Sequence, residues 1–164
     1  MPSPTTFRPF LGVTIGDPAG IGPEIVAKAV IQEDVRAACR VLIIGEAEVM
    51  RRAIRMCRLD LPVRSITSAA EVTADPGCLQ VLDLKNIDTA VCPPGVLAPH
   101  CGRAAVEYLN KAIDLAIAHE LDGVVTGPLN KEAMAQAGFK YDGQTELFAA
   151  RTGTKDYAML LVVG

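Results

Sequence analysis

A turn rich in glycine and proline near the N-terminus is the feature that most constrains how this chain can fold. Residues 14–24 read Thr-Ile-Gly-Asp-Pro-Ala-Gly-Ile-Gly-Pro-Glu and join two apolar segments. Residues 11–15 predict a strand. Residues 25–30 predict a helix that has Pro23 in its first turn, where the missing N–H costs no hydrogen bond. A strand that turns directly into a helix favours an α/β fold, and the helix N-terminus can approach an anion.

The three glycines of this turn leave two interpretations open. Glycine adopts positive φ angles and lets a ligand approach the backbone closely, but the same residues also suit a tight turn that binds nothing. Positions 16, 20 and 22 do not fit G-x-G-x-x-G, and no Gly-Lys-Ser/Thr follows them. The turn is therefore neither the common dinucleotide fingerprint nor a P-loop.

Apolar runs and helical periodicity alternate along the rest of the chain. The clearest helix carries apolar side chains at i, i+3, i+4 and i+7 spacing, so one of its faces packs on a sheet. We expect a three-layer α/β/α fold with a largely parallel sheet, forming one unit over residues 1–164 with no internal boundary. The expected strands are residues 41–45, 63–66, 80–84, 123–126 and 157–163, and the expected helices are residues 47–57, 103–119, 132–137 and 146–151.

Composition excludes several classes of function. The net charge of -3 argues against a general nucleic-acid or anionic membrane surface. The N-terminus has no apolar signal region, and the apolar run at residues 157–163 is too short to span a bilayer. The five cysteines form no C-x-x-C pair, so we expect reduced packing residues in a cytoplasmic protein. Of the two histidines, we place His100 in a loop with its role open, and we expect His119 to end a helix in a structural role.

Two further motifs follow predicted secondary structure. Residues 126–131, Thr-Gly-Pro-Leu-Asn-Lys, come directly after a strand, where open α/β sheets bind ligands. Asn130 can cap the next helix and Lys131 can contact an anion, although a capped turn with an exposed lysine explains the pattern equally well. Residues 143–146, Gly-Gln-Thr-Glu, precede another helix. Thr145 is either its N-cap or a hydroxyl presented to a polar substrate.

In this order and spacing the three motifs resemble the 4-hydroxythreonine-4-phosphate dehydrogenase family, from about Leu11 to the end of the chain. The first motif also resembles the Gly-Asp-Gly-Ile-Gly-Pro-Glu opening of the isopropylmalate dehydrogenases, with Pro18 and Ala19 added. The resemblance implies an isocitrate/isopropylmalate dehydrogenase-like fold and a cytoplasmic homodimer of pyridoxine and pyridoxal phosphate biosynthesis. It further implies that NAD or NADP oxidises a secondary alcohol of a small phosphorylated hydroxy acid, such as 4-phosphohydroxy-L-threonine, and that the product loses CO₂.

The resemblance also implies site residues. It makes Gln144 and Thr145 substrate contacts and places Lys131 and Asp17 in the same pocket, and it assigns no catalytic or cofactor-binding residue in this chain. The family normally has histidine where this chain has Gln144, and glutamine cannot become cationic. Relatives act on tetronate phosphates or on terephthalate cis-dihydrodiol, and the latter vary at this motif, so these substrates are alternatives.

Members of the family are about twice as long as this chain. Their divalent metal (zinc, magnesium or cobalt) is held by three histidines that follow the region matched here, and neither His100 nor His119 corresponds to them. We therefore expect this chain to be the N-terminal half of such an enzyme, with no metal site of its own and inactive alone. A non-catalytic binding or assembly fragment is the alternative.

Overall fold

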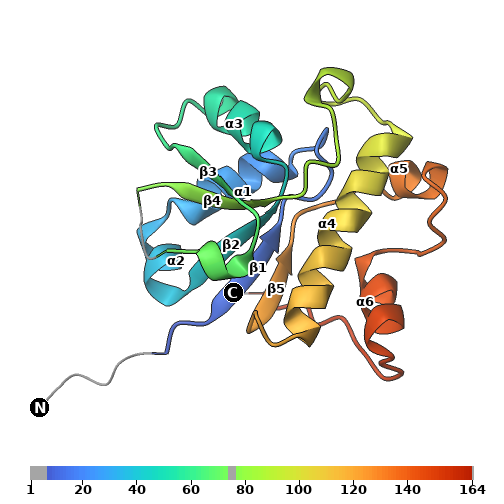
Figure 1. The fold of residues 1–164 in the computed structure, drawn as a ribbon. Helices are drawn as coiled ribbons and strands as arrows, with labels where there is room; N and C mark the ends of the chain where they lie inside the picture. The colour runs from blue at the N-terminus through green and yellow to red at the C-terminus, as the bar shows by residue number, and fades with distance from the viewer. Residues whose placement is uncertain (1–6, 74–76, 164) are drawn as a thin grey trace, which may run out of the picture.

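Five parallel strands form the centre of the structure, a computed structural model that describes residues 7–73 and 77–163 (Figure 1). The strands lie in the order β3-β4-β2-β1-β5, and β1 is paired in register with both β2 and β5. This confirms the α/β class and the parallel sheet expected from the sequence. The strands are β1 (Phe10–Thr14), β2 (Arg40–Gly45), β3 (Val63–Ile66), β4 (Leu79–Asp83) and β5 (Gly123–Thr126).

Helices cover both faces of the sheet, as right-handed crossover connections require. The chain runs from β1 to β2 through α1 (Gly22–Val30) and from β2 to β3 through α3 (Ala47–Met56), and these two helices contact each other. It then returns from β4 to β5 in the opposite direction through α4 (Pro99–Ile117), which crosses the other face (Figure 1). The central strand β2 is therefore enclosed, and Leu42, Ile43 and Ile44 are fully buried.

Two short helices form an additional layer outside α4. They are α5 (Lys131–Gln136) and α6 (Gln144–Thr152), which lie beside α4 at the right of Figure 1. The long helix is apolar on both sides for this reason: one side packs on the sheet, and the other shares a second small core with α5 and α6. The buried members of that core are Val106, Leu109, Ile113, Met134 and Leu147.

Most of the expected elements are confirmed within a few residues, and the main differences lie at their ends. The long helix begins at Pro99, so His100 lies in its first turn and not in a loop. Gly143, not Thr145, precedes α6, and no side chain caps that helix. The helix α2 (Glu33–Ala38) was not expected because its six residues bury no side chain and carry no clear periodicity. Single 3₁₀ turns occur at η1 (Ala69–Glu71) and η2 (Thr89–Val91).

The strand expected at residues 157–163 is absent from the described structure. The segment has no regular secondary structure, and its apolar side chains are exposed, from 52% for Tyr157 to 91% for Val163. A strand needs a neighbour that takes up its backbone hydrogen bonds, and no described strand pairs with these residues. The prediction of a strand is therefore wrong for the described structure, because an apolar pattern within the segment does not indicate whether a neighbouring strand is present. Among the described residues, no helix is both long and apolar enough to cross a membrane.

Candidate functional site

The carboxyl ends of β1 and β5 meet where the chain connections change direction. The connection from β1 leads to β2 on one side, whereas the connection from β4 passes over β2 and β1 to reach β5 on the other. Open parallel sheets bind their ligands in the crevice at such a switch point. The loops that leave the two strands here are residues 15–21 and residues 127–130, which contain the first two sequence motifs.

Backbone contacts join these two loops directly. The amide of Asp17 donates to the carbonyl oxygen of Pro128 at 3.0 Å, and the amide of Gly127 donates to that of Thr14 at 2.9 Å. Gly16 lies in the left-handed region with φ +71°, and a Cβ atom there would lie 2.2 Å from the Pro128 oxygen. Only glycine satisfies both conditions, because a side chain would collide with the second loop.

The other two glycines of the turn do not use positive φ angles, contrary to the expectation for the motif as a whole. In the described backbone, neither Gly20 nor Gly22 has a positive φ angle. A Cβ atom at Gly22 would instead lie 2.1 Å from the carbonyl oxygen of Ile15. Gly22 therefore allows α1 to begin directly against the end of β1.

A cavity of about 280 Å³ opens between these loops and a third segment. Residues 17–21 and 128–130 form two of its walls, and residues 95–97 form the third. The amide of Gly95 donates to the carbonyl oxygen of Ala19 at 2.7 Å, which joins the third segment to the first. No motif in the sequence indicated that this segment would contact the first loop.

Asp17 is the buried acidic group of this cavity, with 5% of its surface exposed. One carboxylate oxygen accepts a hydrogen bond from the amide of Ala19 at 2.8 Å, so the side chain shapes its own loop. Burial raises the pKa of Asp17, and the hydrogen bonds from the amides of Ala19 and Gly20, with the nearby His100, partly oppose that rise. The structure thus places Asp17 in the wall of this cavity.

Arg52 of α3 fixes the relative position of two cavity walls. Its guanidinium group donates to the carbonyl oxygen of Pro18 at 2.7 Å and to that of Cys92 at 2.6 Å. The planar guanidinium presents several donors in a fixed arrangement, which suits a bridge between two carbonyl groups. No sequence motif indicated this role, because the contacts join residues far apart in the chain.

The third motif reaches the same loops from their other side. Gln144 is the first residue of α6, and its Nε2 donates to the carbonyl oxygen of Gly127 at 3.2 Å. This contact uses the amide nitrogen, and the amide oxygen of a glutamine can accept further hydrogen bonds. Thr145 is half-buried in the same helical turn. Neither residue lines the Asp17 cavity.

Lys131 lies close to the third motif. It is exposed at the start of α5, and its Nζ lies 4.0 Å from where a Cβ atom of Gly143 would be. Asn130 precedes it as the helix N-cap, and its side chain accepts from the amide of Ala133, as expected. The turn at residues 127–130 therefore separates Asp17 on one side from Gln144 and Lys131 on the other.

A second acidic group lies at the ends of the neighbouring strands. Glu46 follows β2 and is 5% exposed, and Asp83 ends β4. Burial, and next the nearby Asp83 carboxylate, raise the pKa of Glu46 to about 7, although the amides of Asn86 and Ile87 oppose this by donating hydrogen bonds. The hydroxyl of the fully buried Tyr108 and one Glu46 oxygen lack a hydrogen-bond partner among the described residues. Neither carboxylate lies in a motif, so this group was not predicted from the sequence.

The two histidines are not arranged to hold a metal. The Nε2 atom of His100 lies 2.8 Å from the carbonyl oxygen of Val91, and His119 follows the C-terminus of α4 with φ +57°. Among the described residues, no three His, Cys, Asp or Glu side chains are grouped so that they could bind a metal ion. The residues present therefore do not fit the three-histidine site that the sequence resemblance implied for longer relatives.

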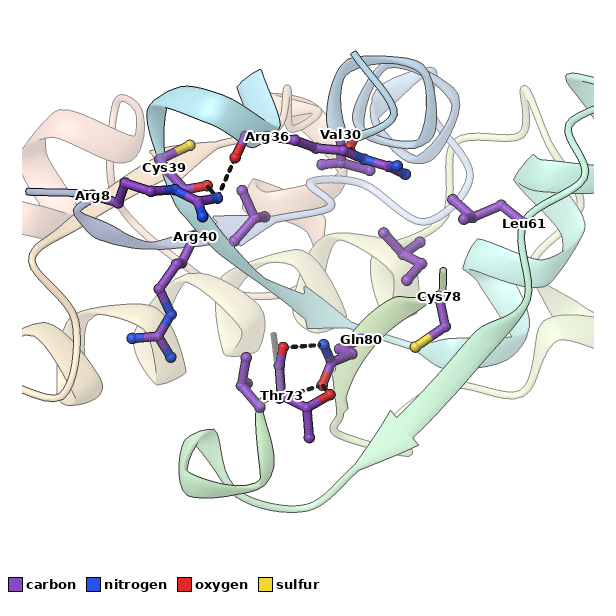
Figure 2. A pocket seen from close by; sticks show the side chains of 12 residues that line it. Arg8, Val30, Arg36, Cys39, Arg40, Leu61, Thr73, Cys78 and Gln80 are labelled. Carbon is purple, nitrogen blue, oxygen red and sulfur yellow. Dashed lines mark hydrogen bonds between the residues drawn. The ribbon is translucent and has the colours of Figure 1, made fainter. Parts of the chain in front are cut away.

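A larger cavity of about 350 Å³ lies at the opposite end of the sheet, where β2 and β4 begin (Figure 2). Most of its lining is apolar, and its polar groups are already paired: Gln80 exchanges hydrogen bonds of 2.8 Å with the backbone of Thr73. Arg8 and Arg36 donate to backbone carbonyl oxygens, and Arg40 lies over the ring of Phe10. Because these polar groups are engaged in contacts within the chain and the cavity lies away from the carboxyl ends, we assign the site to the switch point.

Fold and cavity together define the class of the protein: a parallel α/β protein with a cavity at the switch point of its sheet, the place where proteins of this class bind small ligands. Within this class, the chain belongs to the family of the pyridoxal phosphate biosynthetic protein PdxA, whose family model matches residues 37–164. This confirms the resemblance found in the sequence motifs.

Known relatives agree with this assignment. A Clostridium botulinum protein, provisionally named D-threonate 4-phosphate dehydrogenase, is 38% identical over 91% of this chain and 45% of its own length. The crystal structure of a 4-hydroxythreonine-4-phosphate dehydrogenase from Burkholderia phymatum is 37% identical with a TM-score of 0.92, over 96% of this chain and 48% of that one. A terephthalate 1,2-cis-dihydrodiol dehydrogenase from Burkholderia xenovorans is 29% identical with a TM-score of 0.69, over 90% of this chain and 41% of that one. The chain thus spans about half the length of the relatives it matches.

Proposed function

We propose that this chain forms the N-terminal part of a dehydrogenase that oxidises a secondary alcohol of a small phosphorylated hydroxy acid. The observation that carries the proposal is the convergence of all three family motifs on one turn, residues 127–130, at the switch point of the sheet. The relatives that share these motifs are named as dehydrogenases of such substrates. We further propose a cytoplasmic homodimer.

The side chains at this turn have distinct proposed roles. Gln144 uses its Nε2 on Gly127, so its amide oxygen accepts from a substrate hydroxyl or ammonium group. The hydroxyl of Thr145, one residue further along α6, is the second contact. Lys131 is exposed nearby and supplies positive charge for the phosphate or carboxylate. Asp17 holds the first loop in shape through its bond to the Ala19 amide.

We also propose a nicotinamide cofactor and a divalent metal. NAD or NADP, when bound, would supply the hydride acceptor. A divalent metal would stabilise negative charge on the reacting oxygen, but the described residues of this chain do not form its site. We therefore propose that metal ligands come from a region corresponding to the second half of the relatives.

The identity of the substrate is tested by a comparison of three compounds. The protein as encoded, with any residues that follow Gly164, is assayed for NADH and NADPH formation with 4-phosphohydroxy-L-threonine, D-threonate 4-phosphate and terephthalate cis-dihydrodiol. Turnover of either phosphorylated compound supports the proposal, and the preferred one identifies the branch of the family. Turnover of the dihydrodiol alone would contradict a phosphorylated substrate. Binding without turnover of any compound would favour a non-catalytic role.

The roles of the α6 residues are tested by substitution in the same protein. Thr145→Ala removes one hydrogen bond to a charged or polar substrate and should lower kcat/KM by roughly ten- to a hundredfold, or roughly 1.5–3 kcal/mol. Thr152→Ala is the matched control, because its hydroxyl bonds to the carbonyl oxygen of Phe148 at the other end of the helix. An unchanged kcat/KM in Thr145→Ala would remove this residue from the site. Gln144→His should retain activity, and a gain on 4-phosphohydroxy-L-threonine would identify Gln144 as a determinant of specificity.

A further inference from the structure

Two of the five cysteines lie in direct contact beneath the candidate site. Cys92 and Cys101 are both fully buried, and their sulfur atoms lie 2.8 Å apart. Cys92 follows the 3₁₀ turn η2, and Cys101 lies in the first turn of α4, nine residues later. Both pack against Ala19 of the first loop.

Other contacts hold this pair in place. Arg52 binds the carbonyl oxygen of Cys92, and the amide of Cys101 donates to the carbonyl oxygen of Ala98 at 3.1 Å. Between the two cysteines the chain folds back, and Gly95 bonds to Ala19. A disulfide has an S–S distance of about 2.05 Å, so the sulfurs need to move only about 0.8 Å closer to form one.

We propose that Cys92 and Cys101 form an oxidisable dithiol, which hydrogen peroxide converts into an intramolecular disulfide. One thiolate attacks a peroxide oxygen and the O–O bond breaks, which gives a sulfenic acid and water once the leaving hydroxide takes up a proton. The second sulfur attacks the sulfenic sulfur, the S–O bond breaks, and a second water leaves with the remaining thiol proton. In total, two thiols lose two electrons and two protons, and one peroxide is reduced to two waters.

Burial makes the first of the two steps slower than the second. It raises the pKa of the Cys101 thiol, as does contact with Cys92, so the first step is slow because thiolate is the reactive form. The segment that joins the two cysteines is on the surface, since residues 93–97 are all exposed. Once a sulfenic acid has formed, its partner thiol is already in contact, so disulfide formation precedes further oxidation to sulfinic acid.

The disulfide would act on the cavity through its third wall. Residues 95–97 line the cavity and lie between the two cysteines. The new bond closes this segment into a short covalent loop and restricts its motion against the first loop. The inference is independent of the proposed substrate, since it concerns two thiols and their oxidant.

The test uses the purified 164-residue chain, reduced and then exposed to hydrogen peroxide. Remaining thiols are alkylated after unfolding, and intact mass and peptide mapping identify the linked residues. We expect the loss of two alkylatable thiols, a mass lower by two hydrogen atoms, and a cross-link between Cys92 and Cys101. A variant with Cys39→Ala, Cys57→Ala and Cys78→Ala retains the pair and should give the same product. Cys101→Ala should form no intramolecular disulfide involving Cys92.

Two results would overturn the proposal. The first is retention of both thiols in the triple variant while peroxide oxidises methionine in the same sample, because this shows that the oxidant was active. The second is a cross-link that involves a different pair in the folded chain. Oxidation in guanidinium chloride provides the reference, since unfolding should scatter the pairing among all five cysteines. A folded chain that gives the same scattered pattern would also contradict the inference.

Discussion

At Gly16 the backbone turns with a φ of +71° directly beneath the carbonyl oxygen of Pro128. Alanine at this position destabilises the folded state in two separate ways. The left-handed backbone costs a residue with a Cβ atom about 1–2 kcal/mol, and displacement of the second loop costs about 1–3 kcal/mol more. We therefore expect Gly16→Ala to lower the free energy of unfolding by several kcal/mol, as measured by urea denaturation.

Gly138 provides the matched control for this substitution. Its φ of +93° is also in the left-handed region, but a Cβ atom there would meet nothing within 4 Å. Gly138→Ala should therefore show only the backbone cost, about 1–2 kcal/mol. Equal losses for the two variants would mean that the contact between Gly16 and Pro128 does not constrain the site.

Glu46 predicts a specific dependence of stability on pH. Its usual pKa is 4.5 and its pKa in the folded chain is about 7. Between these values the folded chain binds a proton that the unfolded chain has lost, so this group's contribution to stability is fully present below pH 4.5 and is lost as pH rises through 7. Glu46→Gln cannot ionise, so its stability relative to the original chain should increase from pH 4.5 to 7 and level off above 7.

The quantity to measure is the free energy of unfolding of Glu46→Gln minus that of the original chain, determined at several pH values across this range. Carboxylates that do not interact with Glu46 contribute equally to both proteins and cancel in the difference, whereas the neighbouring Asp83 does not. Glu71→Gln is the control, because hydrogen bonds from Thr67 lower the pKa of Glu71 on the surface. Its difference curve should have no step between pH 4.5 and 7. A flat difference curve for Glu46→Gln would show that Glu46 ionises normally.

At the scale of the elements, α5 depends on its N-cap. The side chain of Asn130 accepts from the amide of Ala133 at 3.0 Å and satisfies one of the free N–H groups of the helix. Asn130→Ala should lower the free energy of unfolding by about 1 kcal/mol. Asn130→Asp keeps an acceptor oxygen and should lose much less. The same loss in both variants, measured by thermal unfolding, would argue against capping.

Periodicity and turn residues predicted the elements well where the signal is local. The strand at residues 123–126 and the cap at Asn130 depend on residues only a few positions apart, so the sequence was sufficient for both. Thr145 shows the limit of such reasoning. Glycine and threonine both suit an N-cap, and the choice of Gly143 depends on how α6 packs and on the contact of Gln144 with Gly127.

Only part of the candidate site was predicted, because part of it depends on contacts between distant segments. Asp17 and the turn at residues 127–130 follow parallel strands, and sheet topology brings such positions together. The third wall at residues 95–97 and the bridge made by Arg52 depend on contacts between distant segments without a common pattern. No spacing rule within the sequence could have indicated them.

At the scale of the whole molecule, the C-terminal segment leaves a continuous apolar surface exposed. Leu160 and Val162 are 87% and 82% exposed and support no core. Apolar surface of this kind promotes association, so we expect the 164-residue chain to self-associate as its concentration rises. A variant with Leu160→Lys and Val162→Lys should remain monomeric in sedimentation velocity experiments and keep its thermal stability.

Glu120→Lys serves as the control for this effect of charge. It changes the net charge by the same amount as the double variant, at an exposed position beyond the end of α4. It should leave association unchanged if apolar contact is the cause. Equal suppression by both variants would assign the association to charge, and a monomeric original chain would contradict the prediction.

The hydrogen bond from Asp17 to Pro128 has a consequence for how the protein matures during synthesis. Its donor follows the first strand and its acceptor follows the fifth. The N-terminal turn therefore leaves the ribosome long before the turn that completes the site. Until residues 127–130 have emerged and β5 has joined β1, a nascent chain carries the glycine motif without its opposite wall. Ligand binding must then come late in folding, after the long crossover through α4 has closed.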